Sequence, residues 1–392
     1  MNIYDEKTCR CALNRLFGFK PAVSAALVAH FGSAASVFAA DRGSLPPGAA
    51  RYFSENGGIS DREYEISDRE IKSLEKYGAE FIYSVQDGYP AILNECGDHP
   101  AGIYIKGDSK PGDIFSRDRI YISIVGTRDI SSYGTEWCRR TVYALADTGA
   151  DICIVSGLAI GCDICAHRAA LECGLPTIAV IPSGIDNIYP FRHRRDADGI
   201  ARRAGCAVVT DYPPGTAPLQ INFIRRNRII AGLSGSTLLI ESKARGGGMI
   251  TARLAFSYDR DVYAIPGRVD DTRSTGCNIL IKEGIATPFI SVDTFIGDIG
   301  LRSAGVGKRH FNTGVEELSK KFSGRVTEED IDTMADILLK IRSKRDIDIQ
   351  TIADECNIGY PRALELLSYL QSDGIVSVDL MQRCSINIRN IV

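Results

Sequence analysis

The stretch from Ile120 to Gly174 constrains the fold more than any other part of the chain. It begins with a short apolar run, rich in β-branched residues, that ends at Gly126. This length and composition are typical of a strand buried on both faces of a parallel sheet. The run over 132–147 then predicts a helix with one apolar side. A second strand is predicted over 152–156, followed by another turn with glycines and another helix.

Two βα units in succession predict an α/β fold with a doubly wound parallel sheet of the extended Rossmann type. The alternation of apolar strands and helical stretches continues to about residue 286. Ligands of such sheets bind outside the carboxyl ends of the strands. We therefore expect the functional residues to lie in the turns that follow the strands.

Two of these turns carry small residues next to a helix start. Small residues let a phosphate approach the backbone N–H groups, and the following helix N-terminus favours an anion. Arg128 adds a fixed positive charge to the first turn. The residues predicted to bind are Gly126, Thr127 and Arg128 in the first turn and Ser156, Gly157 and Gly161 in the second.

Several further runs follow these turns in a recognisable order. They include IVGTR, SGLAIGCD, AHRAAL, TIAVIPSGIDNIYP, FIRRNRIIAGLS, MITARLA and PGR followed by STGCNILIKEGI. In order and spacing they resemble the DNA-processing protein A (DprA/Smf) family over roughly residues 10 to 385. The RNRIIAGLS run, together with SGLA and AH, is highly specific, whereas a single glycine turn is a weak signal.

The resemblance implies a single-stranded DNA-binding protein that is not an enzyme and needs no cofactor. Such a protein protects incoming single-stranded DNA and helps to load a RecA-type recombinase during natural transformation or recombination. The implied partners are single-stranded DNA, the recombinase, a single-strand-binding protein as a further candidate, and a second copy of the chain. A homodimer through the α/β core is expected.

The composition indicates a cytoplasmic protein. The N-terminus has no basic region followed by an apolar run, and no apolar stretch has the length of a membrane span. The 12 cysteines are scattered through apolar segments, as expected of reduced thiols. Lys and Arg outnumber Asp and Glu between residues 117 and 283, although the whole chain has a net charge of -3. This local excess favours a basic groove in the core.

The RRNR run is the most basic part of the core. By resemblance, Arg225 occupies the position of a DNA contact, and Arg226, Asn227 and Arg228 match the RNR motif of the family. Three guanidinium groups within four residues of a helix cannot all face one way. A structural role for one or two of them, paired with buried carboxylates, is the open alternative.

A third glycine-rich turn, KARGGGMIT, is predicted to bind phosphate or sugar through its backbone. Its candidate residues are Lys243, Gly246, Gly247, Gly248 and, by resemblance through the MITARLA run, Thr251. Consecutive glycines suit close approach of a ligand to the backbone. The alternative is that the glycines only allow a tight turn between strand and helix.

Asp163 and His167 lie four residues apart on a predicted helix and hence on one face. Their residue types suit a general acid–base pair, but no nucleophile or second carboxylate accompanies them. A structural role is therefore favoured. Cys162, Cys165 and His167 lack the fourth ligand and the spacing of a zinc site, so no metal is expected.

Four segments are predicted along the chain. Residues 1–70 form a small helical domain that resembles helix-hairpin-helix or SAM-type modules, 76–300 form the DNA-binding core, 300–323 form a linker, and 324–392 resemble a winged helix. Acidic residues outnumber basic ones in the last segment. Its charge indicates a protein contact or a structural role, since a DNA-reading helix is expected to be basic.

A nucleotide-binding enzyme related to the lysine-decarboxylase-like phosphoribohydrolases is the alternative function. Those enzymes carry a Pro-Gly-Gly-x-Gly-Thr-x-x-Glu run, and the nearest match here is PSGID at residues 182–186. DNA binding is therefore preferred. The sequence does not show whether Tyr133, Tyr189, Phe223 or none of them stacks on bases.

Overall fold

The computed structural model describes residues 4–18, 20–40, 59–301, 318–319, 321–322, 324–343, 347–379 and 382–386. The chain divides into two compact units, residues 1–302 and 303–392. Most of the predicted linker over 300–323 and part of the N-terminal segment, residues 41–58, lie outside the described residues. Among the described residues, no helix combines the length and apolarity that crossing a membrane requires.

The first unit contains a nine-stranded sheet in the order β1-β2-β6-β5-β4-β3-β7-β8-β9. Its strands are β1 (Ala79–Tyr83), β2 (Gly102–Lys106), β3 (Ile120–Val125), β4 (Ile152–Ser156), β5 (Thr177–Val180), β6 (Ala207–Thr210), β7 (Ser236–Leu239), β8 (Asp261–Ala264) and β9 (Thr287–Pro288). Strands β3 to β9 run parallel, whereas β2 is antiparallel to β6 and β1 to β2. Strand β2 lies one strand in from the edge of the sheet, because β1 pairs outside it.

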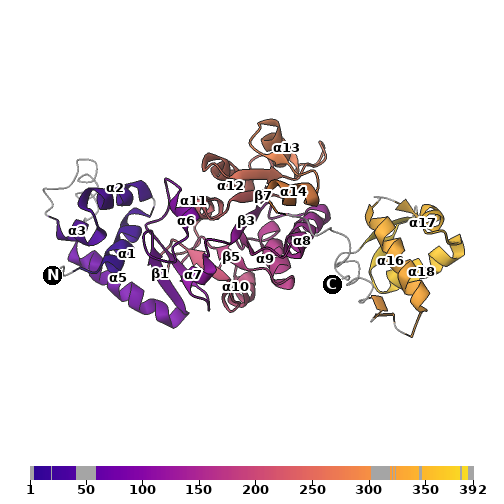
Figure 1. Cartoon of the computed structure of the whole chain (residues 1–392), viewed down its shortest axis with the longest axis horizontal. Coiled ribbons are helices and arrows are strands. Elements are labelled where there is room, and N and C mark those ends of the chain that lie inside the picture. Colours follow the sequence, from indigo (N-terminus) through magenta and orange to yellow (C-terminus); the bar gives the residue numbers. More distant parts are fainter. Residues whose placement is uncertain are drawn as a thin grey trace. The chain divides into compact units, whose positions relative to one another are not determined.

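The order of the parallel strands makes the sheet doubly wound (Figure 1). The chain builds β3 to β6 outward in one direction and then returns to add β7 to β9 on the other side of β3. The helices between these strands are α8 (Ser132–Asp147), α9 (Cys162–Glu172), α10 (Arg194–Ala201), α11 (Gln220–Gly232), α12 (Gly247–Ser257) and α13 (Thr275–Lys282). The predicted doubly wound α/β fold is confirmed, with its point of reversal between β3 and β7.

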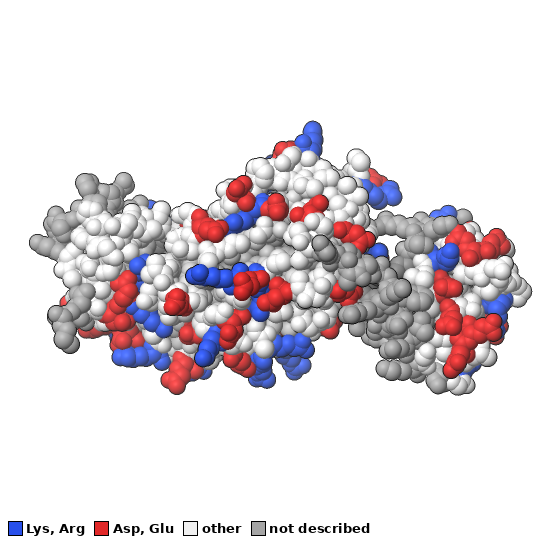
Figure 2. All heavy atoms as spheres, in the orientation of Figure 1, with Lys and Arg blue, Asp and Glu red and all other residues white. Residues whose placement is uncertain are grey.

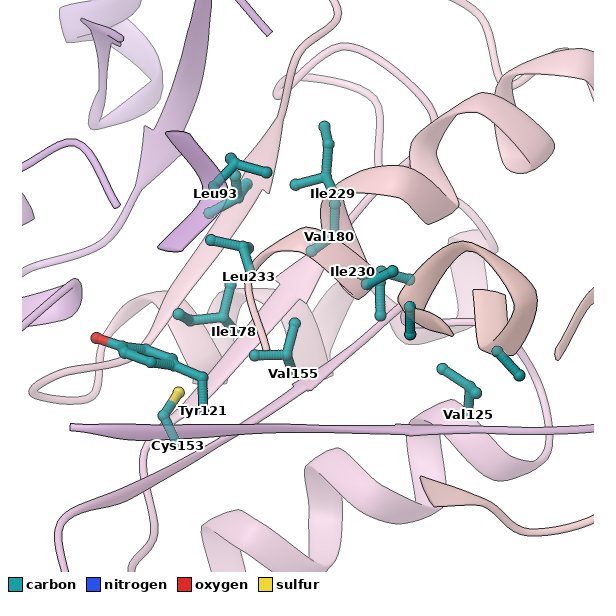
Figure 3. Packing of buried hydrophobic residues seen from close by; sticks show 14 of the residues in the cluster. Leu93, Tyr121, Val125, Cys153, Val155, Ile178, Val180, Ile229, Ile230 and Leu233 are labelled. Carbon is teal, nitrogen blue, oxygen red and sulfur yellow. The ribbon is translucent and has the colours of Figure 1, made fainter. Parts of the chain in front are cut away.

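Apolar side chains fill both faces of the sheet. On one face, Ile229, Ile230 and Leu233 of α11 and its C-cap pack on residues of β3, β4 and β5 such as Val155 and Ile178 (Figure 3). The strands read as continuous apolar runs because both of their faces are covered. Helices α8 and α9 cover the opposite face. The two-sided core holds the turns at the strand ends in fixed positions.

Helix α11 begins well before the arginines of the RRNR run. Its first residue is Gln220, and its N-cap, Leu219, has no side-chain capping bond. The usual start signal, a Ser, Thr, Asp or Asn cap, is thus missing from the sequence. Arg225 consequently lies in the second turn of the helix and not at its entry.

The N-terminal helices α1 (Glu6–Phe17), α2 (Pro21–Phe31), α3 (Ala34–Ala39) and α5 (Asp61–Ser73) form their own apolar cluster. They also attach to the sheet through buried polar contacts. Glu70 on α5 accepts hydrogen bonds from Arg15 on α1 and from the hydroxyl of Tyr104 on β2. Asn14 donates to the carbonyl oxygen of Asp211 across 2.9 Å. The helices therefore belong to the same compact unit as the sheet.

The second unit contains α16 (Glu328–Ser343), α17 (Ile349–Glu355) and α18 (Tyr360–Ser372). Its strands β10 (Ile347–Asp348), β12 (Arg383–Ile386) and β11 (Val376–Val378) form an antiparallel sheet. Acidic side chains cover much of the face of this unit that Figure 2 shows. The winged helix remains a prediction for this unit.

Candidate functional site

Three of the predicted turns meet at the carboxyl ends of the parallel strands, which we call the carboxyl edge. A Cβ atom on Gly161 would lie 2.4 Å from the carbonyl oxygen of Thr127. The N–H of Cys162 donates to the same oxygen across 3.1 Å. A Cβ on Gly248 would lie 3.3 Å from the Cα of Gly126. Only glycine allows such close backbone packing, so these glycines serve to bring the turns together.

An arginine and two aromatic rings form a continuous group at the carboxyl edge. The guanidinium carbon of Arg128 lies 5.1 Å from the ring centroid of Phe223, a cation–π contact. The ring of Tyr189 meets Phe223 edge to face, with centroids 5.5 Å apart and planes at 81°. Arg128 and Tyr189 are exposed, and Phe223 is half-buried. The edge thus presents one positive charge beside two aromatic surfaces.

Part of the predicted set is accessible to a ligand at this edge. Gly126, Thr127, Gly161, Arg225 and Gly246 are partly exposed, and Arg128, Lys243 and Gly247 are exposed. Arg245, close to Lys243, is exposed as well. The acidic residue next to Arg128 is occupied, because Arg273 donates to the Asp129 carboxylate across 3.0 Å. Positive charge therefore predominates among these side chains.

The rest of the predicted set is buried and braces the site from within. Ser156 is fully buried, and its hydroxyl donates to the carbonyl oxygen of Ile124 across 2.6 Å. Thr251 is 2% exposed. The buried members are Ser156, Gly157, Arg226, Asn227, Arg228, Gly248 and Thr251. Their side chains do not reach the surface, so they are not available for direct contact with a ligand in this conformation.

Arg226 of the RNR motif makes hydrogen bonds inside the protein. Its Nη1 donates to the carbonyl oxygens of Gly157 and Val180, at the ends of β4 and β5. Asp163 is the nearby carboxylate that favours the charged form of Arg226, while burial lowers the pKa of Arg226 to about 10. A Cβ on Gly157 would lie 2.2 Å from Nη1 of Arg226 and 2.6 Å from Oδ2 of Asp163. Position 157 must therefore be glycine for both groups to fit.

Arg228 makes a second internal connection. It forms a buried ion pair with Asp211, after β6, and also donates to the carbonyl oxygen of Asp98. Burial raises the pKa of Asp211, and the charge of Arg228 opposes that rise. Asn227 donates to the carbonyl oxygen of Gly247 across 3.5 Å, which links α11 to the start of α12. Arg226, Asn227 and Arg228 therefore connect α11 to neighbouring parts of the carboxyl edge.

His167 is buried and hydrogen-bonded in the interior. Its Nδ1 lies 2.7 Å from the hydroxyl of Thr177, which itself donates to the carbonyl oxygen of Ile154. Nδ1 must therefore carry the proton in this pair. Burial lowers the pKa of His167 to about 3, so the ring is neutral at pH 7. Asp163 faces Arg226, and burial raises its pKa. Neither residue is presented to a substrate at the surface.

A carboxylate of the protein occupies the start of α8. Glu241 accepts hydrogen bonds from the N–H and the hydroxyl of Ser131, the N-cap of this helix, at 2.9 and 2.5 Å. A Cβ on Gly134 would lie 2.7 Å from the Glu241 carboxyl carbon. In dinucleotide-binding sheets, the corresponding helix start holds the pyrophosphate. In this protein the Glu241 carboxylate takes the position of the pyrophosphate at the start of α8.

Apolar residues at the same edge were missed by the sequence reasoning. Ile160, Phe191, Leu219, Ile221 and Ile224 are 37%, 75%, 59%, 45% and 44% exposed. Ile160 lies in the turn after β4, and Phe191 lies in the segment after β5. Leu219, Ile221 and Ile224 belong to the start of α11. Isolated apolar residues in turns give no periodic signal in the sequence. The Phe-Arg-His-Arg-Arg run at 191–195, which combines an aromatic with three arginines, is the signal that could have indicated this part of the site. Among the described residues, no group of three or more His, Cys, Asp or Glu is placed to hold a metal ion.

Comparisons with known proteins find similar sequences and a similar solved structure. A family model described as DNA recombination-mediator protein A matches residues 80–300. The chain is 38% identical to DNA processing protein DprA of Streptococcus pneumoniae over 225 residues, 57% of this chain and 76% of that protein. It is 37% identical to Protein Smf of Escherichia coli over 211 residues, which is 54% of each, so it matches about half the length of that relative. The X-ray structure of DprA from Streptococcus pneumoniae matches with a TM-score of 0.54 and 33% identity, over 63% of this chain and 85% of that chain.

Proposed function

Because the chain belongs to the DNA recombination-mediator protein A family, we propose that it binds single-stranded DNA along the carboxyl edge without altering it. One observation carries the proposal. Arg128 lies over the ring of Phe223, and Tyr189 adjoins that ring, at an edge whose neighbouring acidic residue is paired. This group offers a charge for a phosphate and aromatic surfaces for bases.

The chemistry of the group favours a single strand over a duplex. Aromatic side chains stack on bases only when the bases are unstacked from each other, and such stacking tolerates any sequence. Arginines neutralise phosphates without reading base identity. We therefore expect weak sequence preference. Arg225, half-buried and two residues after Phe223 on α11, and exposed Lys243 complete the proposed phosphate contacts.

The nucleotide-binding enzyme has less support as an alternative. Glu241 supplies the negative charge at the start of α8, where such a protein would place its phosphates. His167 is neutral and enclosed, and Asp163 is buried next to Arg226. An acid–base role requires that a group reach the reacting atom. Both residues instead support the packing of α9.

The resemblance to the family also supports the partners that we propose for the whole protein. They are a RecA-type recombinase, which this protein would help to load during transformation or recombination, and a single-strand-binding protein. We further propose a homodimer through the core and a cytoplasmic location. Sedimentation of the full chain at micromolar concentration tests the dimer, and a strictly monomeric protein would contradict it.

A salt titration tests the DNA-binding proposal. Each phosphate neutralised on a single strand contributes about 0.7 to the slope of log affinity against log salt. Arg128→Ala and Arg225→Ala should each weaken binding to a mixed-sequence single strand and flatten the slope by about this amount. Arg69→Ala, an exposed arginine on α5 in the N-terminal helices, is the matched control.

Two outcomes would contradict the proposal. Folded Arg128→Ala and Arg225→Ala proteins that keep the wild-type affinity and slope would place the groove elsewhere. Cleavage of the strand or release of a base during the titration would show that the protein is an enzyme. Thermal melting of each variant verifies that it is folded.

A further inference from the structure

We propose that residues 189–195, the Tyr-Pro-Phe-Arg-His-Arg-Arg segment after β5, form a second part of the single-strand track. This inference rests on the proposed function and extends the binding surface beyond Arg128 and Phe223. Phe191 is 75% exposed, and Arg192, Arg194 and Arg195 are exposed. The segment would take a phosphate chain on its arginines and an unstacked base on Phe191.

The segment is held firmly against the site already described. Inside it, His193 is 4% exposed, and its Nδ1 makes a 2.8 Å hydrogen bond with the carbonyl oxygen of Leu158 in the turn after β4. At its start, the Tyr189 ring packs edge to face on Phe223. The two anchors tie the segment to the turn after β4 and to Phe223, the ring that Arg128 covers.

The positive charge of the segment has no acidic partner among the residues that the structure describes. Two carboxylates follow on α10, but Asp196 accepts two hydrogen bonds from Arg168, at 2.8 and 3.1 Å. Asp198 accepts from Lys106 across 3.0 Å. No described ion pair involves Arg192, Arg194 or Arg195. An anionic ligand would supply the missing counter-charge.

The position of the arginines is unfavourable for the helix itself. Arg194 and Arg195 are the first two residues of α10, where the helix dipole disfavours cations. Side chains of a helix lean toward its N-terminus. The start of α10 follows the carboxyl end of β5, so both side chains lean toward the carboxyl edge. A role in binding accounts for charges that weaken the helix.

An exposed aromatic among arginines fits a single strand better than an apolar protein surface. A protein partner covering Phe191 would also have to cover three uncompensated charges, and desolvating unpaired charges is costly. A single strand offers stacking for the ring and phosphates for the charges. The charge of the segment therefore favours a single strand over an apolar protein surface.

Binding to oligonucleotides of increasing length tests the proposal in the full-length protein. Arg194→Ala/Arg195→Ala removes two charges at the start of α10, and Arg202→Ala/Arg203→Ala removes two exposed charges just past its end. The first pair should flatten the salt slope on long strands by about 1.4, twice the value for one phosphate. The Arg194→Ala/Arg195→Ala variant should bind the shortest strand with the same affinity as the wild type. The Arg202→Ala/Arg203→Ala variant should have the wild-type affinity at every length. Phe191→Ala should weaken long-strand binding at least about fivefold, the loss of one stacked base.

The results separate this inference from the proposed function. If Arg128→Ala weakens binding at all lengths but the first pair behaves like the second, the inference is wrong and the proposed function stands. If Arg128→Ala also has no effect, the proposed function itself fails. Loss of self-association in Phe191→Ala, with DNA affinity unchanged, would assign the segment to a contact between copies and overturn the proposal. All variants change exposed side chains, and thermal melting confirms their folding.

Discussion

Arg226 on α11 donates a hydrogen bond from Nη1 to the carbonyl oxygen of Gly157, in the turn after β4, across 2.8 Å. The contact joins two runs that are 69 residues apart in the chain. It explains why a glycine-rich turn and an arginine-rich helix occur together. The glycine leaves room for the guanidinium group, and the guanidinium group fixes the turn that borders the proposed DNA track.

Gly157→Ala should therefore destabilise the protein. The new Cβ would lie 2.2 Å from Nη1 of Arg226 and 2.6 Å from Oδ2 of Asp163. Overpacking of this kind costs about 1–3 kcal/mol. Gly199→Ala is the control, because no atom lies within 4 Å of its Cβ position on α10. It should be neutral or raise stability by up to about 1 kcal/mol. Denaturant unfolding gives both values, and equal midpoints for Gly157→Ala and wild type would contradict the prediction.

The buried pair of Arg228 and Asp211 gives a second prediction. Arg228→Met leaves the Asp211 carboxylate buried without its partner, which should cost about 3–5 kcal/mol. Arg228→Met combined with Asp211→Leu removes both charges and should restore part of that loss. A double-mutant cycle in denaturant unfolding measures the difference. If the double variant is no more stable than the Arg228→Met variant, an unpaired charge is not the cause.

Much of the fold could be predicted from the sequence, because strands buried on both faces leave a strong signal. The apolar runs over 120–125 and 152–156 became β3 and β4. Two features could not be predicted in this way. Helix α11 begins without a capping side chain, and the pairing of β1 outside β2 is a tertiary contact that no local pattern shows.

The candidate site was only partly predictable for a related reason. Residue type and spacing placed Arg128 and Arg226 in one region, but they do not show which guanidinium group turns inward. Arg128 is exposed, whereas Arg226 is 3% exposed and bonded to carbonyl oxygens of two strand ends. That choice depends on where α11 begins and on the space beside Gly157. Both are properties of the packed structure.

Removal of residues 303–392 should leave the affinity for single-stranded DNA nearly unchanged. These residues form a separate compact unit, and acidic side chains cover much of its visible face (Figure 2). Negative charges repel phosphates and offer them no contact. Filter binding of the truncated and full-length proteins measures the effect, and Arg128→Ala in the truncated protein should weaken binding as it does in the full chain. A loss of more than about tenfold, roughly 1.4 kcal/mol, would show that this unit touches DNA.

The last prediction concerns the stability of the protein in acid. Burial lowers the pKa of His167 from 6.5 to about 3 in the folded chain. Between these two pH values the unfolded chain binds a proton at this position and the folded chain does not, so acid favours unfolding. The contribution of neutral, buried His167 is fully present above pH 6.5. It should fall by roughly 1.4 kcal/mol per pH unit well below that value.

His167→Asn should flatten this dependence of the unfolding free energy between pH 7 and pH 5. Asp163 and Asp211 have raised pKa values and act in the opposite direction at low pH, so the comparison must be the difference between variant and wild type. His30→Asn, which replaces an exposed histidine on α2, controls for the exchange of a histidine for asparagine. Denaturant unfolding at several pH values gives the slopes. Parallel curves for wild type and His167→Asn would mean that His167 titrates in the folded protein as it does in the unfolded chain.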